Sequence, residues 1–398
     1  MLVCQIGAPA ASRPYAVLTL LWLVGWTLRI PILATPPLAT RMAESLDLGS
    51  AGLSAVTMLP IITVALGAVP AAWIVARIGV RAAVVGGICV MVVASTARGQ
   101  VPSATIVFSM SLIMGLGVAL FQTALPAATR VWTPRHVALG SAVYLNGMMV
   151  GELSAAGLTL PVVLPLAGGD WRLALGLWAV PVALVAVLVM IVRLPQDRTV
   201  SGCNTLPRMG VLPRWRDVRV WQYGALTGSS VVAFYVVNAY AGSVLEARGE
   251  TDALGGLYFA YNAMPLLASI AVLKAPQWIG SRRPVAFAAL MLAIGLAGFV
   301  CFDRWASWIS ALCVGFASTV QLILLTSLPP SIANGTAVTR LSAGMTLVGF
   351  TVSFVLPLIG GWLAEATGMI EIALLPALVF MLVALAALGR NARYPRYE

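Results

Sequence analysis

The sequence predicts an all-α membrane protein with twelve transmembrane helices arranged as two six-helix bundles. Hydrophobic residues make up 60% of the 398 positions, charged residues only 9%, and the mean hydropathy is +0.96. Because soluble domains carry about 25% charged residues, this composition excludes a soluble globular chain. The apolar residues also occur in blocks of about 20, which is the length that a helix needs to cross a bilayer.

Twelve apolar segments, separated by short breaks that carry most of the charges, define the expected spans in order. They lie at 15–39, 51–75, 82–97, 104–128, 137–165, 172–192, 219–244, 254–277, 284–302, 305–328, 341–364 and 372–389. The apolar run of the first segment is too long for a cleaved signal peptide, so we expect it to be the first span.

The basic residues predict the orientation of the spans. With a cytoplasmic N-terminus, 18 Lys and Arg residues fall on the inner side and 5, Arg98 among them, on the outer side, while Arg29 lies inside a span. The positive-inside rule then places both termini in the cytoplasm. The net charge of +11 comes from residues in short loops rather than from one clustered face, so we expect no nucleic-acid partner.

The longest polar stretch, residues 194–218, lies at the centre of the chain and predicts a cytoplasmic linker between bundles 1–193 and 219–398. Gly79 and Gly280 follow the second span of each half and lie 201 residues apart, as an internal duplication requires. Repeated bundles of this kind are typical of secondary transporters, whose solute sites lie near the midplane.

Several other classes of protein lack support in the sequence. The five cysteines are scattered without a C-x-x-C pair, and His136 is the single histidine. Neither a disulfide framework nor a metal site is indicated, and we expect no cofactor. No Walker sequence is present, which argues against ATP as a direct driver. No nucleophile cluster points to an enzyme.

Arg29 is the first candidate functional residue because it lies inside the first span. A charged side chain at that depth costs several kcal/mol unless it is paired. Counting from Arg13, it is about 24 Å along the helix, in the outer half of the bilayer. Trp22 and Trp26 precede it at helical spacing, and prolines at 31, 36 and 37 are expected to break the helix beside a cavity.

Two interpretations of Arg29 remain open at this point. In the functional one, its guanidinium holds carboxylate-like or nitro-like oxygens by paired donors, and Trp22 and Trp26 shape the pocket. In the other, Arg29 extends along its aliphatic stem to the membrane surface and the tryptophans form an interfacial belt.

Glu152 is the other charge well inside a span, 16 residues beyond His136, and this spacing predicts the same depth as Arg29. It either neutralises Arg29 in a structural salt bridge or changes protonation during transport. Burial favours the neutral form of a carboxyl group and a nearby arginine favours the ionised form, so the two effects oppose each other. Gly147 and Gly151 nearby predict close helix packing, and Tyr144 is a candidate pocket residue on the same helix.

Neutral polar residues supply the remaining candidates for solute contact, although buried amides and phenols commonly only join neighbouring helices. The second bundle contributes most of them, and Gln122 comes from the first. Those of the second bundle are Tyr235, Asn238, Tyr258, Tyr261, Asn262 and Gln321.

The loop after the second span resembles the signature of the major facilitator superfamily. The stretch Arg77-Ile78-Gly79-Val80-Arg81 keeps the Arg-x-Gly-x-Arg end of that signature, while Ala76 stands where the family has aspartate. The resemblance implies a twelve-helix transporter in which Arg77, Gly79 and Arg81 take part in conformational gating.

A closer resemblance is to the cyanate and 2-nitroimidazole transporter family within that superfamily, and it implies transport of a small compound. It covers most of the first half of the chain. The matching stretches are Arg29-Ile30-Pro31, Pro36-Pro37-Leu38, Leu59-Pro60, Arg98-Gly99, Leu125-Pro126, Leu160-Pro161, Trp171-Arg172, Trp178-Ala179-Val180-Pro181 and, in the second half, Phe234-Tyr235.

The sequence therefore predicts a monomeric secondary transporter of a small polar or anionic solute, working by alternating access and with possible coupling to protons through Glu152. The scarcity of lysine fits a bacterial origin, and we expect the inner membrane. A multidrug or metabolite exporter of the same superfamily is the first alternative, and a passive channel is the second.

Overall fold

The computed structural model describes residues 14–100, 103–192, 194, 215–329 and 336–390, and every regular element in these ranges is helical. The first half holds α1 (Pro14–Leu33), η1 (Pro36–Leu38), α2 (Ala39–Leu46), α3 (Ser50–Ile78), α4 (Val80–Gln100), α5 (Ala104–Trp132), α6 (Val137–Leu158), η2 (Thr159–Val163), α7 (Leu164–Leu166) and α8 (Trp171–Ile191). The second half holds α9 (Val218–Ala247), η4 (Thr251–Ala253), α10 (Leu254–Lys274), η5 (Pro276–Trp278), α11 (Arg282–Cys301), α12 (Arg304–Thr326), α14 (Thr336–Thr367), η6 (Ile370–Leu374) and α15 (Leu375–Arg390).

The helices agree with the twelve expected spans. Within the described residues, eleven helical segments are long and apolar enough to cross a membrane, and the shorter apolar helix at 370–386 follows as the twelfth. The expected linker falls largely on residues 195–214, which lie outside the described ranges. Asp217 then begins α9, because its carboxylate accepts a hydrogen bond from the Arg219 N–H at 2.9 Å.

The break in the first span differs in one respect from the expectation. Pro31 lies inside α1, which continues to Leu33, so this proline does not end the helix. The chain leaves the α-helix only before Pro36 and Pro37, whose rings begin the short helix η1. Pro36 and Pro37 lack the N–H groups that would continue the helical hydrogen bonds, whereas Thr35 before them keeps helical backbone angles (φ −76°, ψ −47°).

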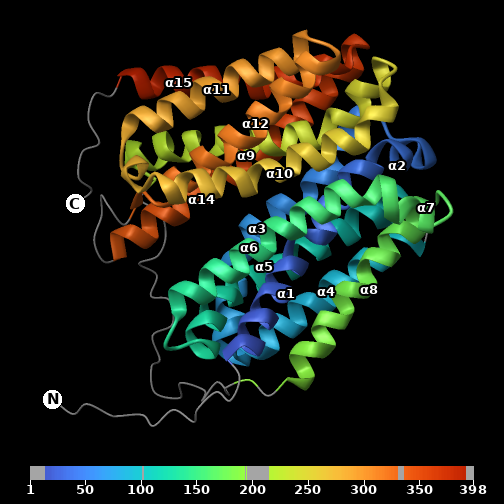
Figure 1. Cartoon of the computed structure of the whole chain (residues 1–398). Helices are drawn as coiled ribbons and strands as arrows, with labels where there is room; N and C mark the ends of the chain where they lie inside the picture. The colour runs from blue at the N-terminus through green and yellow to red at the C-terminus, as the bar shows by residue number, and fades with distance from the viewer. Residues whose placement is uncertain (1–13, 101–102, 193, 195–214, 330–335, 391–398) are drawn as a thin grey trace.

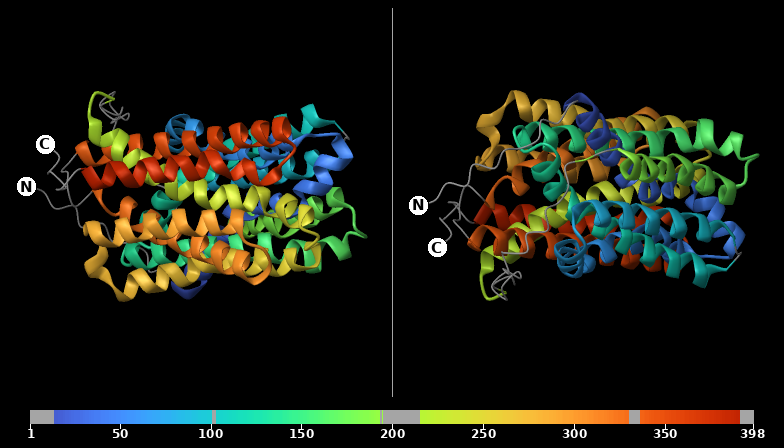
Figure 2. Two further views of the ribbon diagram at one scale, coloured as in Figure 1. Left: turned by 90° about the horizontal axis from the view of Figure 1, so that it is seen from above. Right: turned by 90° about the horizontal axis from the view of Figure 1, so that it is seen from below.

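The helices form two bundles that lie side by side (Figure 1), α1 to α8 in one and α9 to α15 in the other. In the first bundle α1 packs on α6, and α5 lies between α3 and α4; in the second, α9 packs on α12 and α14. Almost all of α9 is buried, so it is the central helix of its bundle. The long helices run nearly parallel to one axis in both further views (Figure 2).

The outer faces of the bundles are apolar, as expected of surfaces in contact with lipid. Large hydrophobic side chains are exposed there, including Leu66 at 61%, Leu184 at 63%, Phe287 at 68% and Val383 at 61%. A soluble protein would not leave such an array in water. The protein is therefore an integral, multi-pass membrane protein.

Glycines allow α1 and α6 to approach closely. A Cβ added at Gly147 or Gly151 of α6 would overlap the main chain of Trp22 or Trp26, and one at Gly25 of α1 would overlap that of Tyr144. Small residues at the crossing of membrane helices let the backbones touch and increase their van der Waals contact. This packing fixes the rotation of α1 against α6 and so the direction of the side chains between them.

The two bundles are joined at the end of the molecule where α3 begins and α14 ends, which we call the closed end. There the Glu365 carboxylate of α14 accepts a hydrogen bond from the Ala51 N–H of α3 at 2.8 Å. The Tyr240 hydroxyl of α9 also reaches the first bundle, where it lies 3.4 Å from the Ser50 carbonyl of α3, and within its own bundle it donates to the Pro357 carbonyl of α14 at 2.8 Å. Nearby, α6 packs on α10, where the Phe259 side chain fills the space beside a glycine of α6.

The glycine contact between α1 and α6 predicts the effect of a single methyl group. We expect Gly151→Ala to lower the unfolding temperature of the detergent-solubilised protein, because overpacking costs about 1–3 kcal/mol. Gly176→Ala is the matched control, since a Cβ at Gly176 of α8 meets no atom within 4 Å. The control should leave the unfolding temperature unchanged or raise it, because alanine favours helix over glycine. An equal response of both variants would contradict the proposed contact.

Candidate functional site

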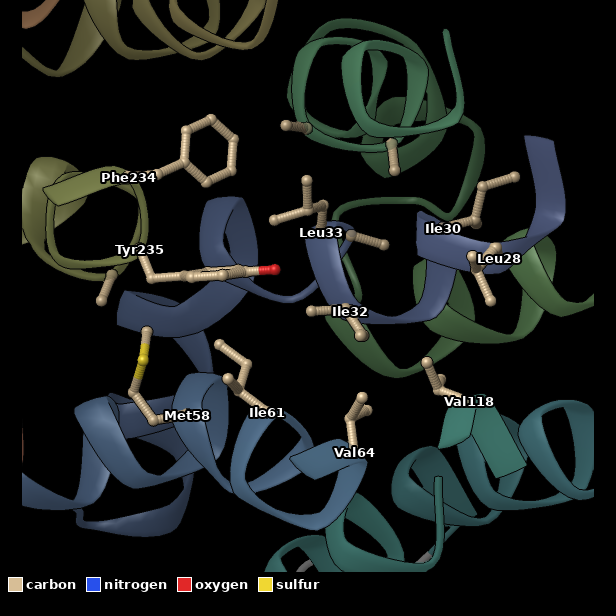
Figure 3. Close-up of a cluster of buried hydrophobic side chains, with 14 of the residues drawn as sticks. Leu28, Ile30, Ile32, Leu33, Met58, Ile61, Val64, Val118, Phe234 and Tyr235 are labelled. Atoms are coloured by element: carbon tan, nitrogen blue, oxygen red, sulfur yellow. The ribbon is translucent and has the colours of Figure 1, made fainter. Parts of the chain in front are cut away.

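Arg29 lies on the face of α1 that meets the second bundle. Its Nη1 donates a hydrogen bond to the Tyr235 hydroxyl of α9 at 2.8 Å, a contact that crosses between the bundles. The Tyr235 ring lies among apolar side chains and its hydroxyl points toward α1 (Figure 3). The guanidinium is thus held at the seam between the two halves and does not extend toward a membrane surface.

Glu152 completes a three-residue cluster with Arg29 and Tyr235. Its Oε1 lies 3.4 Å from Arg29 Nε, and the two side chains are 10% and 12% exposed. The contact is an ion pair rather than a hydrogen bond, because Arg29 Nε has no acceptor in hydrogen-bond geometry among the described residues. In a medium of low dielectric constant a charge pair offsets much of the cost of burying each charge. The guanidinium can therefore still donate hydrogen bonds to a further acceptor, because Nε has none among the described residues.

The two tryptophans beside Arg29 both bond to α6. Trp22 Nε1 donates to the Asn146 amide oxygen at 2.9 Å, and Trp26 Nε1 donates to the Ser154 hydroxyl at 3.0 Å. Both rings are half-buried. Asn146 and Ser154 were not among the residues expected at the site, because a polar side chain of that size in a span does not by itself indicate its partner.

Asn238, Tyr258 and Asn262 form a buried network between α9 and α10. The Asn262 amide donates to the Asn238 side-chain oxygen at 3.0 Å, and the Tyr258 hydroxyl donates to the Asn238 carbonyl at 2.9 Å. All three are almost fully buried. Tyr261, on the same helix, bonds to the Phe234 carbonyl at 3.1 Å and stacks on the Phe234 ring. In this conformation these side chains hold α9 and α10 together behind Tyr235.

The remaining polar candidates are spread over the molecule. Gln321 of α12 is buried and donates to the Leu226 carbonyl at 2.8 Å and the Ser229 hydroxyl at 2.9 Å, both on α9. Gln122 of α5 is half-buried, and its side-chain oxygen has no partner among the described residues. Tyr144 is half-buried on α6 one turn before Met148, and its main chain contacts α1. The structure shows no contact that joins Gln321 to the Arg29 cluster within the described ranges.

The residues expected to act in gating lie where α3 gives way to α4. Gly79 has a φ of 85°, which a residue with a side chain rarely adopts, and Arg77 lies over the Trp73 ring at 3.7 Å. Arg81 Nη2 donates to the carbonyls of Val189, Met190 and Val192 at 2.6–3.0 Å. Arg81 therefore caps the last turn of α8, where a cation is favoured by the helix dipole.

Arg98 is a correction to the sequence-based expectation. The positive-inside pattern assigned it to an outer loop, but it occupies the last turn of α4 and is fully buried. The sequence held one indication that Arg98 has a structural role, because Arg98-Gly99 is among the stretches that resemble the transporter family. Among the described residues no group of three His, Cys, Asp or Glu side chains could hold a metal ion.

A family model described as the Major Facilitator Superfamily matches residues 17–353. Among similar proteins, the 2-nitroimidazole transporter of Escherichia coli (strain K12) is 25% identical over 353 residues, which is 87% of each chain. The cyanate transport protein CynX of the same strain is 23% identical and is aligned over 88% of this chain and 90% of its own. The gentisate transporter of Corynebacterium glutamicum is 22% identical over 69% of this chain and 64% of its own.

Solved structures show the same fold. A point mutant of the nucleoside transporter NupG superposes with a TM-score of 0.76 at 12% identity, and the match covers 96% of this chain and 100% of the NupG chain. A D-xylose–proton symporter superposes with a TM-score of 0.72 at 16% identity over 94% and 97% of the two chains. These relatives are transporters rather than enzymes, and the family match spans most of the helices described above. The chain belongs to the Major Facilitator Superfamily and is a transporter of small solutes.

Proposed function

We propose that the protein moves a small polar or anionic solute, of the cyanate, nitro or carboxylate class, by alternating access with Arg29 as the binding cation. The observation that carries this proposal is the position of Arg29 at the seam of the bundles, bonded to Tyr235 of one bundle and paired with Glu152 of the other. A solute bound there touches both halves, as a solute must if its binding is to bias their arrangement.

The chemistry of a guanidinium supports the choice of solute class. Its planar fork of N–H donors matches two oxygens of a carboxylate or nitro group. The names of three relatives refer to a nitroimidazole, to cyanate and to gentisate, and each compound offers electronegative atoms to such donors. Trp22 and Trp26, which are half-buried on the same face of α1 as Arg29, would form an apolar wall beside a flat solute.

Charge balance gives Glu152 its proposed role. The Arg29–Glu152 pair is neutral, so an anion that binds to Arg29 leaves one uncompensated negative charge in a medium of low dielectric constant. A proton taken up by Glu152 restores neutrality, and the solute and the proton then cross together. Proton coupling of this kind gives a reason for an acidic residue to lie next to the arginine that binds the solute.

Alternating access is proposed from the contacts at the closed end. Hydrogen bonds from the Ala51 N–H to Glu365 and from the Tyr240 hydroxyl to the Ser50 carbonyl hold the bundles together there, and transport requires that they break when the opposite end closes. We further propose that the closed end faces outward, that both termini are cytoplasmic, and that one chain of two bundles in a bacterial inner membrane is the working unit. Gating by Arg77, Gly79 and Arg81 is part of the same proposal.

An exporter with an apolar pocket remains the second candidate, favoured by the apolar side chains around Tyr235, which include Ile32, Ile61 and Phe234 (Figure 3). The exporter differs from the anion transporter in one respect that can be measured, because the binding of an apolar solute would not depend on the Arg29 charge. A passive channel is separated from both by solute counterflow in liposomes, which a simple pore does not produce.

Loss of the Arg29 charge should weaken the binding of small anions and nitro compounds. We expect Arg29→Met to lower the affinity for cyanate, nitroimidazole or gentisate at least tenfold, because a hydrogen bond to a charged group contributes about 1.5–3 kcal/mol. The measurement is the ligand-induced shift in unfolding temperature. Arg41→Met, at an exposed arginine of α2, is the matched control. Anion binding that survives in Arg29→Met would remove Arg29 from the site.

The single variant leaves Glu152 buried without its partner, which costs about 3–5 kcal/mol. The double variant Arg29→Met/Glu152→Met avoids this cost by removing both charges. It should fold and still fail to bind anions, and a double variant that binds them normally would count against the proposal as directly as the single one.

The charge-balance argument predicts that coupling and binding can be separated at Glu152. We expect Glu152→Gln to keep solute counterflow in proteoliposomes but to lose accumulation driven by an imposed pH gradient, because the amide cannot take up a proton. Glu44→Gln, at an exposed position of α2, should retain both. Gradient-driven accumulation by Glu152→Gln would show that the Arg29–Glu152 pair is only structural.

A further inference from the structure

Arg98 is a fully buried arginine for which no acidic partner is found in the described part of the chain. It extends from the last turn of α4 to the point where α1 ends. Its Nη1 donates to the Thr35 hydroxyl at 3.1 Å and its Nη2 donates to the Pro31 carbonyl at 3.2 Å, while Nε has no acceptor. A buried charge with neutral partners is costly to keep, so its position calls for an explanation.

The geometry of the break in α1 explains why a cation is stable there. The Thr35 N–H does not continue the α-helix to Pro31; it points to the Ile32 carbonyl instead, at 3.4 Å. The Pro31 carbonyl is therefore free to accept from Arg98 and from the Thr35 hydroxyl. The last carbonyls of a helix carry partial negative charge, and Arg98 neutralises this charge at the end of α1.

The segment held by Arg98 connects the Arg29 cluster to the opposite bundle. Arg29 precedes Pro31 by two residues, on the α1 side of the break. Pro36 follows Thr35 directly, and its carbonyl is 3.3 Å from the Tyr258 hydroxyl of α10. The same Tyr258 bonds to the α9 chain at Asn238, one turn from Tyr235. Arg98 thus bonds to a segment, residues 29–36, that contacts the second bundle at both ends.

We propose that Arg98 is a positioning residue for transport: it fixes the chain where α1 ends, so that Arg29 is directed at Tyr235 and the Pro36 carbonyl is presented to Tyr258. Arg98 does not touch the solute. It acts through α1, so that the direction of Arg29 and the closure of the bundles are set by one guanidinium. The effect on solute affinity rests on the function proposed above for Arg29, whereas the effect on closure does not.

The first test measures closure without any solute. Spin labels on Glu44→Cys of α2 and Met369→Cys, after α14, report the distance between the bundles at the closed end in a chain whose five native cysteines are replaced by serine. Both positions are exposed. We expect Arg98→Met and Tyr258→Phe each to add a population at longer distance. Arg41→Met is the control and should keep the distribution of the unsubstituted protein.

The second test separates positioning from a general loss of structure. Solute affinity should fall at least tenfold in Arg98→Met and only a few-fold in Thr35→Val, which removes one acceptor but leaves Arg98 bonded to the Pro31 carbonyl. Arg98→Lys, which can still donate to the Pro31 carbonyl, should recover part of both the affinity and the short-distance population. Such a rescue by a cation is not expected if the side chain merely fills space.

The outcomes are distinguishable. If Arg98→Met and Thr35→Val keep both the distance distribution and the affinity, the proposal is overturned. If Arg98→Met fails to fold, Thr35→Val decides: a shift in distance supports the proposal and an unchanged distance overturns it. If the distances shift as expected while Arg29→Met still binds anions, the positioning of the closed end stands and the function proposed for Arg29 fails.

Discussion

The cluster of Arg29, Glu152 and Tyr235 is the constraint on which the rest of the structure depends, because ionised groups at the seam of two apolar bundles are stable only with partners. Glu152 supplies the opposite charge from α6 and Tyr235 supplies an oxygen from α9. Glycine contacts hold α6 against α1 closely enough for the first of these interactions. The Asn238–Tyr258–Asn262 network supports α9 behind the second. Helix packing in both bundles therefore converges on one guanidinium.

The sequence was sufficient for the spans because the bilayer allows few solutions. Twenty apolar residues between charged breaks can only be a crossing helix, and the expected segments agree with the helices to within a few residues at most ends. The same reasoning found Arg29 and Glu152, since a charge deep in a span is rare and costly. Equal distances from Arg13 and His136 placed them at one depth, and their side chains lie in contact. Their roles in binding and coupling stay predictions.

The sequence was less informative where the outcome depends on how a helix is rotated or where it ends. Asn238 and Asn262 bond to each other, and Gln321 bonds to α9, because the packing turns these amides toward neighbouring helices. Arg98 was assigned to a loop because a charged residue next to an apolar segment usually marks the end of the transmembrane span. The structure continues α4 past it, and its partners lie on α1, 63 and 67 residues away along the chain. No local pattern encodes such a contact.

The Glu365–Ala51 hydrogen bond has a consequence for how water takes part in the separation of the closed end. The first N–H groups of a helix lack partners within it, and here a carboxylate from the other bundle satisfies one of them. If the bundles part, the N–H group needs a new partner, and water, which already reaches the exposed Glu365 carboxylate, can supply one to both groups. Separation and hydration of the closed end therefore proceed together.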